Sequence, residues 1–179
     1  MMKALIPDAI LESVFTIDLD ELQKRNIQGL LIDIDNTLVP WGQPHMEEAF
    51  VNWVQQAKDR GFRVCLVSNA REERARSFAD LLDIPAVGQA LKPLGRAFRR
   101  GMDLLDLGPG RVAVIGDQLF TDVFGGNRLG LYTILINPLS TTELGSTKVM
   151  RKLERKALTR MVKRGLISAE SMQVRRGRD

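Results

Sequence analysis

Short apolar runs alternate with longer amphipathic segments along this chain. The runs are rich in Val, Ile and Leu, are bounded by Gly, Asp, Asn or Ser, and cover residues 29–32, 63–67, 112–115 and 132–136. Runs of this length and composition are typical of buried β-strands. Because nearly every position is apolar, rather than every second one, they indicate a parallel sheet that is covered on both faces.

Helical patterns fill the gaps between these runs. They cover residues 46–60, 71–82 and 93–105, and less clearly 121–129, which two adjacent glycines interrupt. Gly61 follows the first segment, Glu72 and Glu73 open the second and Pro93 starts the third, all of which are typical signals of helix ends. Asp18 predicts the N-cap of a further short helix that continues to residue 25. Strands that alternate with helices predict an α/β fold with a three-layer, Rossmann-like core and a mainly parallel sheet.

Composition adds few constraints. The 179 residues suffice for one domain with a full core, and contents of 44% hydrophobic and 27% charged residues are ordinary for a globular protein. No apolar run approaches the roughly 18 residues that cross a bilayer, and the N-terminus lacks the apolar block of a signal peptide. We therefore expect a cytoplasmic protein. Cys65, the single cysteine, lies within a predicted strand, which favours a buried structural thiol over a nucleophile.

Charge divides the chain into two parts. Residues 1–142 carry 15 Lys and Arg against 18 Asp and Glu, whereas residues 143–179 carry 11 against 4. We expect residues 1–142 to form the core, including an N-terminal segment that wraps it, and residues 143–179 to extend the same domain as a basic helix and tail. An apolar stripe within this helix allows two readings, which can both hold: docking on the core, or peripheral contact of residues 148–164 with an anionic membrane at its inner, cytoplasmic face.

Polar residues collect where the predicted strands end. Asp33, Asp35 and Thr37 follow the first strand at alternating positions. Ser68 and Asn69 follow the second strand, and Asp117 and Asp122 follow the third. Lys92 precedes the helix that starts at Pro93. Sites in open parallel sheets form at the carboxyl ends of the strands, so these side chains should converge. Adjacent carboxylates repel by about 4 kcal/mol at an effective dielectric near 20, which points to a cation between them.

These residues resemble the four motifs of the haloacid dehalogenase (HAD) superfamily of phosphatases. The resemblance rests on Asp33-x-Asp35-x-Thr37, Ser68-Asn69, Lys92-Pro93 and Gly116-Asp117-x-x-x-Thr121-Asp122. A closer likeness, to the YqeG-type branch of subclass IIIA, covers nearly the whole chain; it adds the residues up to Trp41, Gly126-Asn127-Arg128, Thr147-Lys148 and Leu153-Glu154-Arg155.

The resemblance implies a role for each motif residue. Asp33 would be the nucleophile that becomes an aspartyl-phosphate, and Asp35 the general acid and base. Mg²⁺ would be held by the carboxylates of Asp33 and Asp117 and the backbone carbonyl of Asp35, with Asp122 orienting its waters from outside. Thr37, Ser68 and Asn69 would bind substrate, and Lys92 would bind phosphoryl oxygens and offset the carboxylates as a catalytic residue.

The intervals between the motifs leave no room for a large cap domain, so the site should be open to bulky substrates. Relatives of this branch are linked to phosphatidylglycerophosphate phosphatase activity, which makes a membrane-borne phosphomonoester with a lipid headgroup the leading hypothesis. A soluble phosphometabolite, a phosphoprotein, or a Mg²⁺-dependent RNA or ribonucleoprotein-binding role remain alternatives. Nucleic acid is disfavoured because the basic tail contains no Phe, Tyr or Trp for base stacking. The sequence leaves the oligomeric state open.

Two smaller features allow alternative interpretations. Arg71, Arg74 and Arg76 begin the helix after Ser68 and Asn69; a solvated helix face accounts for them, and contact with a polyanionic substrate is the alternative. Trp41 is either a core residue or a side chain at the mouth of the site.

Overall fold

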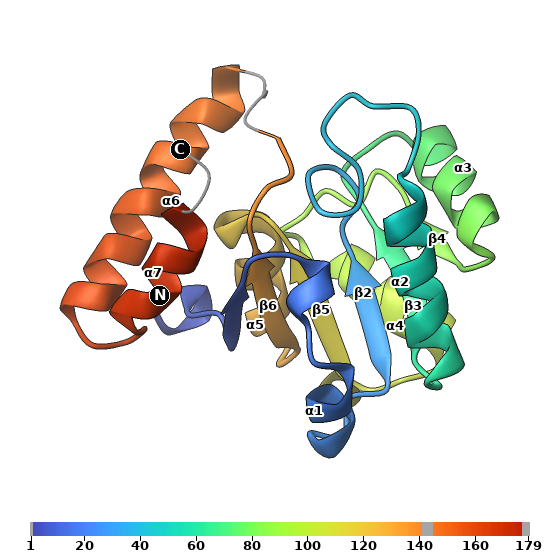
Figure 1. The fold of residues 1–179 in the computed structure, drawn as a ribbon, viewed down its shortest axis with the longest axis horizontal. Coiled ribbons are helices and arrows are strands. Elements are labelled where there is room, and N and C mark those ends of the chain that lie inside the picture. Colours follow the sequence, from blue (N-terminus) through green and yellow to red (C-terminus); the bar gives the residue numbers. More distant parts are fainter. Residues whose placement is uncertain (1, 141–144, 177–179) are drawn as a thin grey trace.

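A single sheet of six parallel strands organises the computed structural model, which describes residues 2–140 and 145–176 (Figure 1). The strands lie in the spatial order β1-β6-β5-β2-β3-β4. Their bounds are β1 Ala9–Leu11, β2 Gly29–Ile32, β3 Arg63–Val67, β4 Ala86–Val87, β5 Val112–Gly116 and β6 Tyr132–Ile136. The four central strands are those that the apolar runs predict, whereas the two short edge strands, β1 and β4, lie outside these runs.

Helices connect the strands in the alternating order that the sequence predicts. The α-helices are α1 Leu19–Lys24, α2 Glu48–Asp59, α3 Glu72–Leu82, α4 Gly95–Leu105, α5 Phe124–Asn127, α6 Gly145–Lys163 and α7 Ala169–Arg176. Asp18 caps α1 as expected, because its carboxylate accepts a hydrogen bond from the backbone N–H of Glu21 at 3.0 Å. The predicted helix over 121–129 is wrong in detail. Its place is taken by a π-helical turn, η4 (Leu119–Val123), followed by the four-residue α5.

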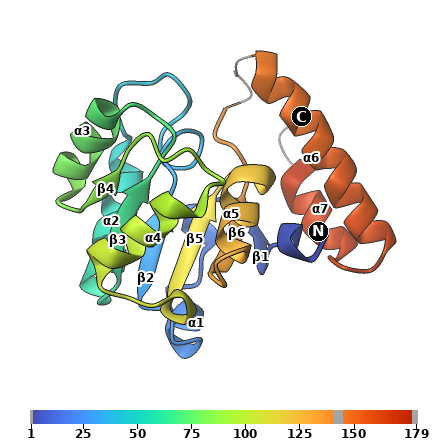
Figure 2. The same ribbon diagram turned by 180° about the vertical axis from the view of Figure 1, so that it is seen from behind.

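Helices cover both faces of the sheet, which confirms the α/β, Rossmann-like architecture. The pleat divides the β2 side chains between two cores: Leu30 and Ile32 pack towards α2 and α3, whereas Leu31 packs towards α4. Figure 2, seen from behind, shows α4 and α5 over this second face. Cys65 is buried in the second core, and burial raises the pKa of its thiol to about 12, consistent with a structural residue.

The C-terminal helices α6 and α7 lie beyond the β1–β6 edge of the sheet (Figures 1 and 2). Two apolar side chains anchor α6: Leu158 and Met161 are buried and share a cluster with Leu119, Val123 and Leu135. Two further apolar residues of α6, Met150 and Leu153, are exposed instead. Residues 143, 144 and 177–179 of the predicted C-terminal segment lie outside the described residues. Among the residues that the structure describes, no helix is both long and apolar enough to cross a membrane.

The strand register brings the carboxyl ends of the central strands to one level. Ile32 at the end of β2 is paired with Leu66 of β3 and with Ile115 of β5. The residues that follow these strands therefore emerge at one edge of the sheet, shown at the top of Figure 1. The connections at this edge, 33–47 after β2 and 68–71 after β3, contain no inserted domain, so no large cap is present in them.

Candidate active site

The loop after β2 carries the two predicted catalytic carboxylates. Asp33 continues the strand, since its backbone N–H donates to the carbonyl of Ile115 at 2.9 Å. The chain then turns sharply at Asn36, whose φ of 62° lies in the left-handed region that asparagine tolerates better than most residues. The carbonyl of Ile34 accepts hydrogen bonds from the next three backbone N–H groups, at residues 37, 38 and 39. This tight loop holds Asp33 and Asp35 at the edge of the sheet, where both line the pocket described next.

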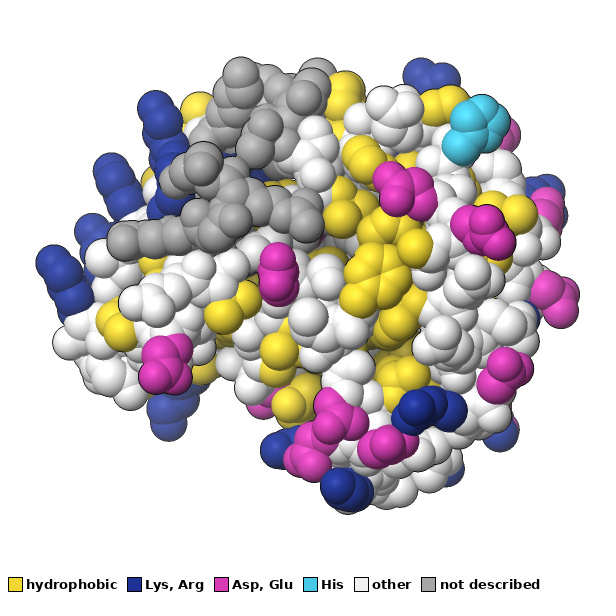
Figure 3. Space-filling view, in the orientation of Figure 1, with side chains coloured by type: hydrophobic (Ala, Val, Ile, Leu, Met, Phe, Trp, Pro, Cys, Tyr) yellow, Lys and Arg dark blue, Asp and Glu magenta, His cyan; other side chains and the backbone are white. Residues whose placement is uncertain are grey.

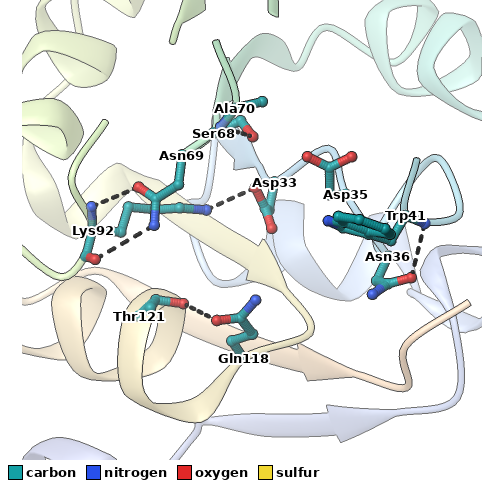
Figure 4. Close-up of a pocket in the computed structure, with 10 residues that line it drawn as sticks. All are labelled: Asp33, Asp35, Asn36, Trp41, Ser68, Asn69, Ala70, Lys92, Gln118 and Thr121. Carbon is teal, nitrogen blue, oxygen red and sulfur yellow. Dashed lines mark hydrogen bonds and ion pairs between the residues drawn. The ribbon is translucent and has the colours of Figure 1, made fainter. Parts of the chain in front are cut away.

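A pocket of about 210 Å³ opens at this edge (Figure 4). Its lining comes from four strand-end segments that are far apart in the sequence: Asp33, Asp35, Asn36, Trp41, Ser68, Asn69, Ala70, Lys92, Gln118 and Thr121. Five of the predicted site residues therefore surround one cavity. Trp41 lines this pocket and is 41% exposed. It therefore lies at the mouth of the site and is not a core residue.

Lys92 is the cation at the centre of the site. Its Nζ lies 2.8 Å from Oδ1 of Asp33 and 2.7 Å from Oδ1 of Asp122, and its side chain is only 3% exposed. Burial by itself lowers the pKa of Lys92, but the carboxylates of Asp122 and Asp33 outweigh burial and raise the pKa above its ordinary value. The ammonium group therefore stays charged and neutralises part of the carboxylate cluster.

Asn69 holds the backbone of Lys92 from the neighbouring loop. The Asn69 Oδ1 accepts a hydrogen bond from the Lys92 backbone N–H at 2.8 Å, and its Nδ2 donates to the Lys92 carbonyl at 3.5 Å (Figure 4). This contact fixes the place from which Lys92 reaches Asp33. The predicted role of Asn69 in binding substrate stays a prediction.

Three buried carboxylates form a group that could hold a metal ion. Oxygen atoms of Asp33, Asp117 and Asp122 all lie within 4.8 Å of one another. Asp122 can approach the end of β5 because residue 116 is glycine; a Cβ there would collide with the Asp122 carboxylate. The Asp122 oxygens are engaged, one by Lys92 and the other by the Gln118 backbone N–H at 3.2 Å, which suits its predicted place outside the direct ligands. Hard carboxylate oxygens are the donors that Mg²⁺ prefers, so the set fits this ion.

Burial dominates the electrostatics of this group. It raises the pKa of Asp117 to about 7, although Arg151 opposes the shift. It also raises the pKa of Asp122 to about 6 against the opposing effect of Lys92. The charge of Asp33 adds to both shifts. Without a metal ion, Asp117 and Asp122 are therefore not both fully ionised near neutral pH.

Asp35 pairs with Arg74, for which the sequence left open a solvated helix face or contact with the substrate. Both Nε and Nη2 of Arg74, on α3, donate to Oδ1 of Asp35, at 3.2 and 2.8 Å. Burial raises the pKa of Asp35, and the Arg74 charge and hydrogen bond oppose that rise. Arg74 also stacks over the ring of Phe78, with its guanidinium carbon 5.0 Å from the ring centroid. The helix face that carries Arg74 is thus turned towards the site.

The two predicted hydroxyl groups differ in position. Ser68 lines the pocket, and its Oγ accepts a hydrogen bond from the backbone N–H of Ala70 at 3.2 Å. Thr37 is fully buried, does not line the pocket, and its Oγ1 has no hydrogen-bond partner among the residues that the structure describes. The location of Ser68 is compatible with substrate contact, whereas Thr37 is part of the packed loop beneath the pocket.

Two residues that contact the site were given no role in it by the sequence analysis. Arg151 of α6 contacts the carboxylate of Asp117 and donates to its carbonyl oxygen at 2.7 Å. Glu154, one turn further along α6, accepts a hydrogen bond from the backbone N–H of Leu119 at 2.7 Å. The sequence held two signals for Glu154: it belongs to the Leu153-Glu154-Arg155 segment that resembles the YqeG-type branch, and it is the single acidic residue of α6.

Comparison with known proteins places this architecture in a family. A family model of haloacid dehalogenase-like hydrolases matches residues 42–130. The Bacillus subtilis protein named "Probable phosphatase YqeG" is 38% identical over 95% of this chain and 99% of its own length. The chloroplastic and mitochondrial phosphatidylglycerophosphate phosphatase 1 of Arabidopsis thaliana is 23% identical over 90% of this chain, which spans about half of that longer protein (49%).

Solved structures show the same fold. The cobalt-bound deoxy-D-mannose-octulosonate 8-phosphate phosphatase YrbI of Haemophilus influenzae superposes with a TM-score of 0.52 and 16% identity, over 83% of this chain and 98% of that chain. This likeness concerns the fold alone. Together with the near-complete match to the Bacillus protein, the sheet order and the strand-end carboxylates show that this chain belongs to the HAD-like phosphatases, in the YqeG-type branch.

Proposed function

We propose that this phosphatase hydrolyses phosphomonoesters with the help of Mg²⁺ and an aspartyl-phosphate intermediate on Asp33. The observation that carries the proposal is the placement of Asp33: it lines the open pocket, contacts Lys92 at 2.8 Å and borders the buried carboxylates of Asp117 and Asp122. A nucleophile, a cation and a metal-binding carboxylate thus meet at one strand end.

The pocket residues divide the reaction between them. A carboxylate oxygen of Asp33 forms a bond to phosphorus while the bond from phosphorus to the leaving oxygen breaks, and Asp35 gives that oxygen a proton. Asp35 then takes a proton from water, whose oxygen attacks the phosphorus and releases inorganic phosphate and free Asp33. Lys92 and Ser68 bind phosphoryl oxygens. The raised pKa of Asp35 suits the group that must first hold this proton.

The metal would be held by the carboxylates of Asp33 and Asp117 and by the backbone carbonyl of Asp35, with Asp122 behind them. When bound, Mg²⁺ would neutralise negative charge on the phosphoryl group during transfer. The three carboxylates within 4.8 Å of one another support this assignment, because these mutually repelling buried acids outnumber the two cations that pair with them, Lys92 and Arg151.

A bulky, membrane-borne phosphomonoester such as phosphatidylglycerophosphate is the substrate class that we propose. The pocket, at about 210 Å³, accommodates a phosphoryl group but lies below the roughly 300 Å³ at which small-ligand pockets begin, so most of a larger substrate would remain outside. The Arabidopsis relative, which is named phosphatidylglycerophosphate phosphatase 1, supports this class.

Exposed apolar side chains flank the pocket and support contact with a membrane. Trp41 lines the mouth, and Leu91 precedes Lys92 and is 69% exposed. On α6, outside the pocket lining, Met150 is 40% exposed. Lys and Arg side chains crowd the outer edge of the molecule over α6 (Figure 3). Apolar side chains beside basic ones are the combination that binds anionic bilayers at their surface. Peripheral contact through residues 148–164 is part of the proposal.

Two experiments test the function. An aryl phosphate should be hydrolysed by the wild-type protein with Mg²⁺, but neither by Asp33→Asn nor by the wild type in EDTA. The exposed control Asp103→Asn should keep its activity. Equal turnover by Asp33→Asn, or activity that survives complete metal removal, would refute the mechanism.

The second experiment concerns the substrate. Turnover of phosphatidylglycerophosphate in anionic vesicles is compared with turnover of soluble sugar phosphates, nucleotides and phosphopeptides. We expect at least a tenfold preference for the lipid. A tenfold preference for a soluble compound would assign the site to a phosphometabolite or phosphoprotein and would leave the mechanism untouched.

A further inference from the structure

Helix α6 reaches the active site through one arginine. Arg151 lies 34 positions beyond Asp117, yet its Nη1 donates to the Asp117 carbonyl at 2.7 Å while its Nη2 pairs with the Asp117 carboxylate. Arg151 therefore binds both the backbone and the side chain of Asp117. A two-point contact of this kind restricts both the position and the rotation of the carboxylate.

Burial separates Arg151 from the other basic residues of the helix. Its side chain is 15% exposed, whereas its basic neighbours Lys152, Arg155 and Lys156 are all exposed. Glu154 is 2% exposed, although a buried carboxylate is costly unless it is paired and hydrogen-bonded. The amphipathic pattern of a surface helix explains the exposed residues and does not explain this buried pair.

Glu154 links Arg151 to the turn that follows Asp117. Its Oε2 accepts a hydrogen bond from Nη1 of Arg151 at 3.1 Å, and its Oε1 accepts one from the backbone N–H of Leu119 at 2.7 Å. Leu119 begins η4, which carries Asp122. The pair thus fixes Asp117 and the start of the segment that carries the next carboxylate, while Leu158 and Met161 hold α6 against the core.

We propose that Arg151 is a positioning residue for Asp117, and that Glu154 and α6 complete the metal site from outside the pocket lining. The proposal rests on the Mg²⁺ site of the proposed function. Neither Arg151 nor Asp117 is among the residues that line the pocket, so the contact between them lies outside the lining of the substrate cavity. Mg²⁺ requires nearly ideal octahedral geometry, and residues that orient its ligands typically change metal affinity by roughly tenfold to a hundredfold.

The alternative role of Arg151 is that of a counter-ion. A cation that only neutralises Asp117 would repel Mg²⁺, so its removal would tighten metal binding. A positioning residue has the opposite effect, because the carboxylate loses its fixed orientation. The sign of the change in affinity therefore separates the two roles.

Isothermal titration calorimetry with Mg²⁺ alone, in the absence of substrate, provides the test. Arg151→Ala should bind Mg²⁺ at least about tenfold more weakly than the wild type. Arg155→Ala removes an exposed arginine from the same helix and should bind as the wild type does. Arg151→Lys keeps the charge but not the two-pronged donor, so its affinity should fall between those of the wild type and Arg151→Ala.

Each outcome decides the proposal. Circular dichroism and urea unfolding show whether each variant is folded. If Arg151→Ala does not fold, the test uses Arg151→Lys and Glu154→Gln, both of which should bind Mg²⁺ more weakly than the wild type. Binding in the folded variants that is equal to or tighter than that of the wild type would overturn the positioning role. A wild-type protein that binds no Mg²⁺ would overturn this proposal and the metal-dependent mechanism together. A soluble substrate preference with intact Mg²⁺ binding would affect only the substrate assignment.

Discussion

Replacing Lys92 with methionine tests how much the central cation stabilises the folded protein. Methionine keeps most of the side-chain volume but removes the ammonium group that lies 2.8 Å from Asp33 and 2.7 Å from Asp122. Removing one partner of a buried ion pair typically costs about 3–5 kcal/mol, because the remaining charge stays buried without compensation. Two carboxylates lose their partner here, so we expect the free energy of unfolding to fall by about 4 kcal/mol. This loss is a large fraction of a typical total stability of roughly 5–15 kcal/mol.

Urea unfolding in EDTA, followed by circular dichroism, measures this loss. The matched control is Lys152→Met, which changes an exposed lysine of α6 and should shift the free energy by less than about 0.5 kcal/mol. Adding Mg²⁺ should restore part of the stability of Lys92→Met, since a ligand that binds only the folded state stabilises it and supplies the missing positive charge.

A double-mutant cycle isolates the pair from the general effect of the substitution. In the Asp122→Asn background, Lys92→Met should cost at least about 1 kcal/mol less than in the wild type, because one of the two orphaned charges is already absent. A loss below about 1 kcal/mol for Lys92→Met alone, or strict additivity with Asp122→Asn, would refute the electrostatic role assigned to Lys92.

Three further measurements probe the site and its support. Burial raises the pKa of Asp117 to about 7 and that of Asp122 to about 6, so the metal-free folded state still binds protons that the unfolded state has released. The urea concentration at the unfolding midpoint, measured in EDTA, should therefore decrease as the pH is raised from 5 to 7.5. A midpoint that increases with pH would contradict the burial of these carboxylates. Leu158→Ala should reduce the free energy of unfolding by roughly 2–5 kcal/mol because Leu158 is fully buried, whereas Leu153→Ala, at an exposed position of α6, should be nearly neutral; equal effects would show that α6 is not docked as described. Gly116→Ala should destabilise the protein by roughly 1–3 kcal/mol and weaken Mg²⁺ binding in calorimetry, because its Cβ would displace the Asp122 carboxylate, and unchanged values for both would refute that contact.

The central sheet and most of the pocket follow from the amino-acid sequence. The four apolar runs become β2, β3, β5 and β6 because fully buried parallel strands must be apolar at almost every position. Parallel strands end at one edge, so the residues after them had to meet there, and Asp33, Ser68 and Lys92 do line one cavity. The edge strands β1 and β4 are only three and two residues long, which is too short for a recognisable periodic pattern.

The tertiary structure alone decided which charged residues join the site. Arg74 and Arg151 sit among other basic residues on their helices, and hydrophobic periodicity distinguishes apolar from polar positions without telling one arginine from the next. Arg74 meets Asp35 across 39 residues and Arg151 meets Asp117 across 34. Such pairs depend on the path by which each helix returns to the sheet and on its rotation there, since a change of one residue turns a helical side chain by about 100°. The sequence therefore determined the acidic strand ends, and long-range packing determined the arginines that hold them.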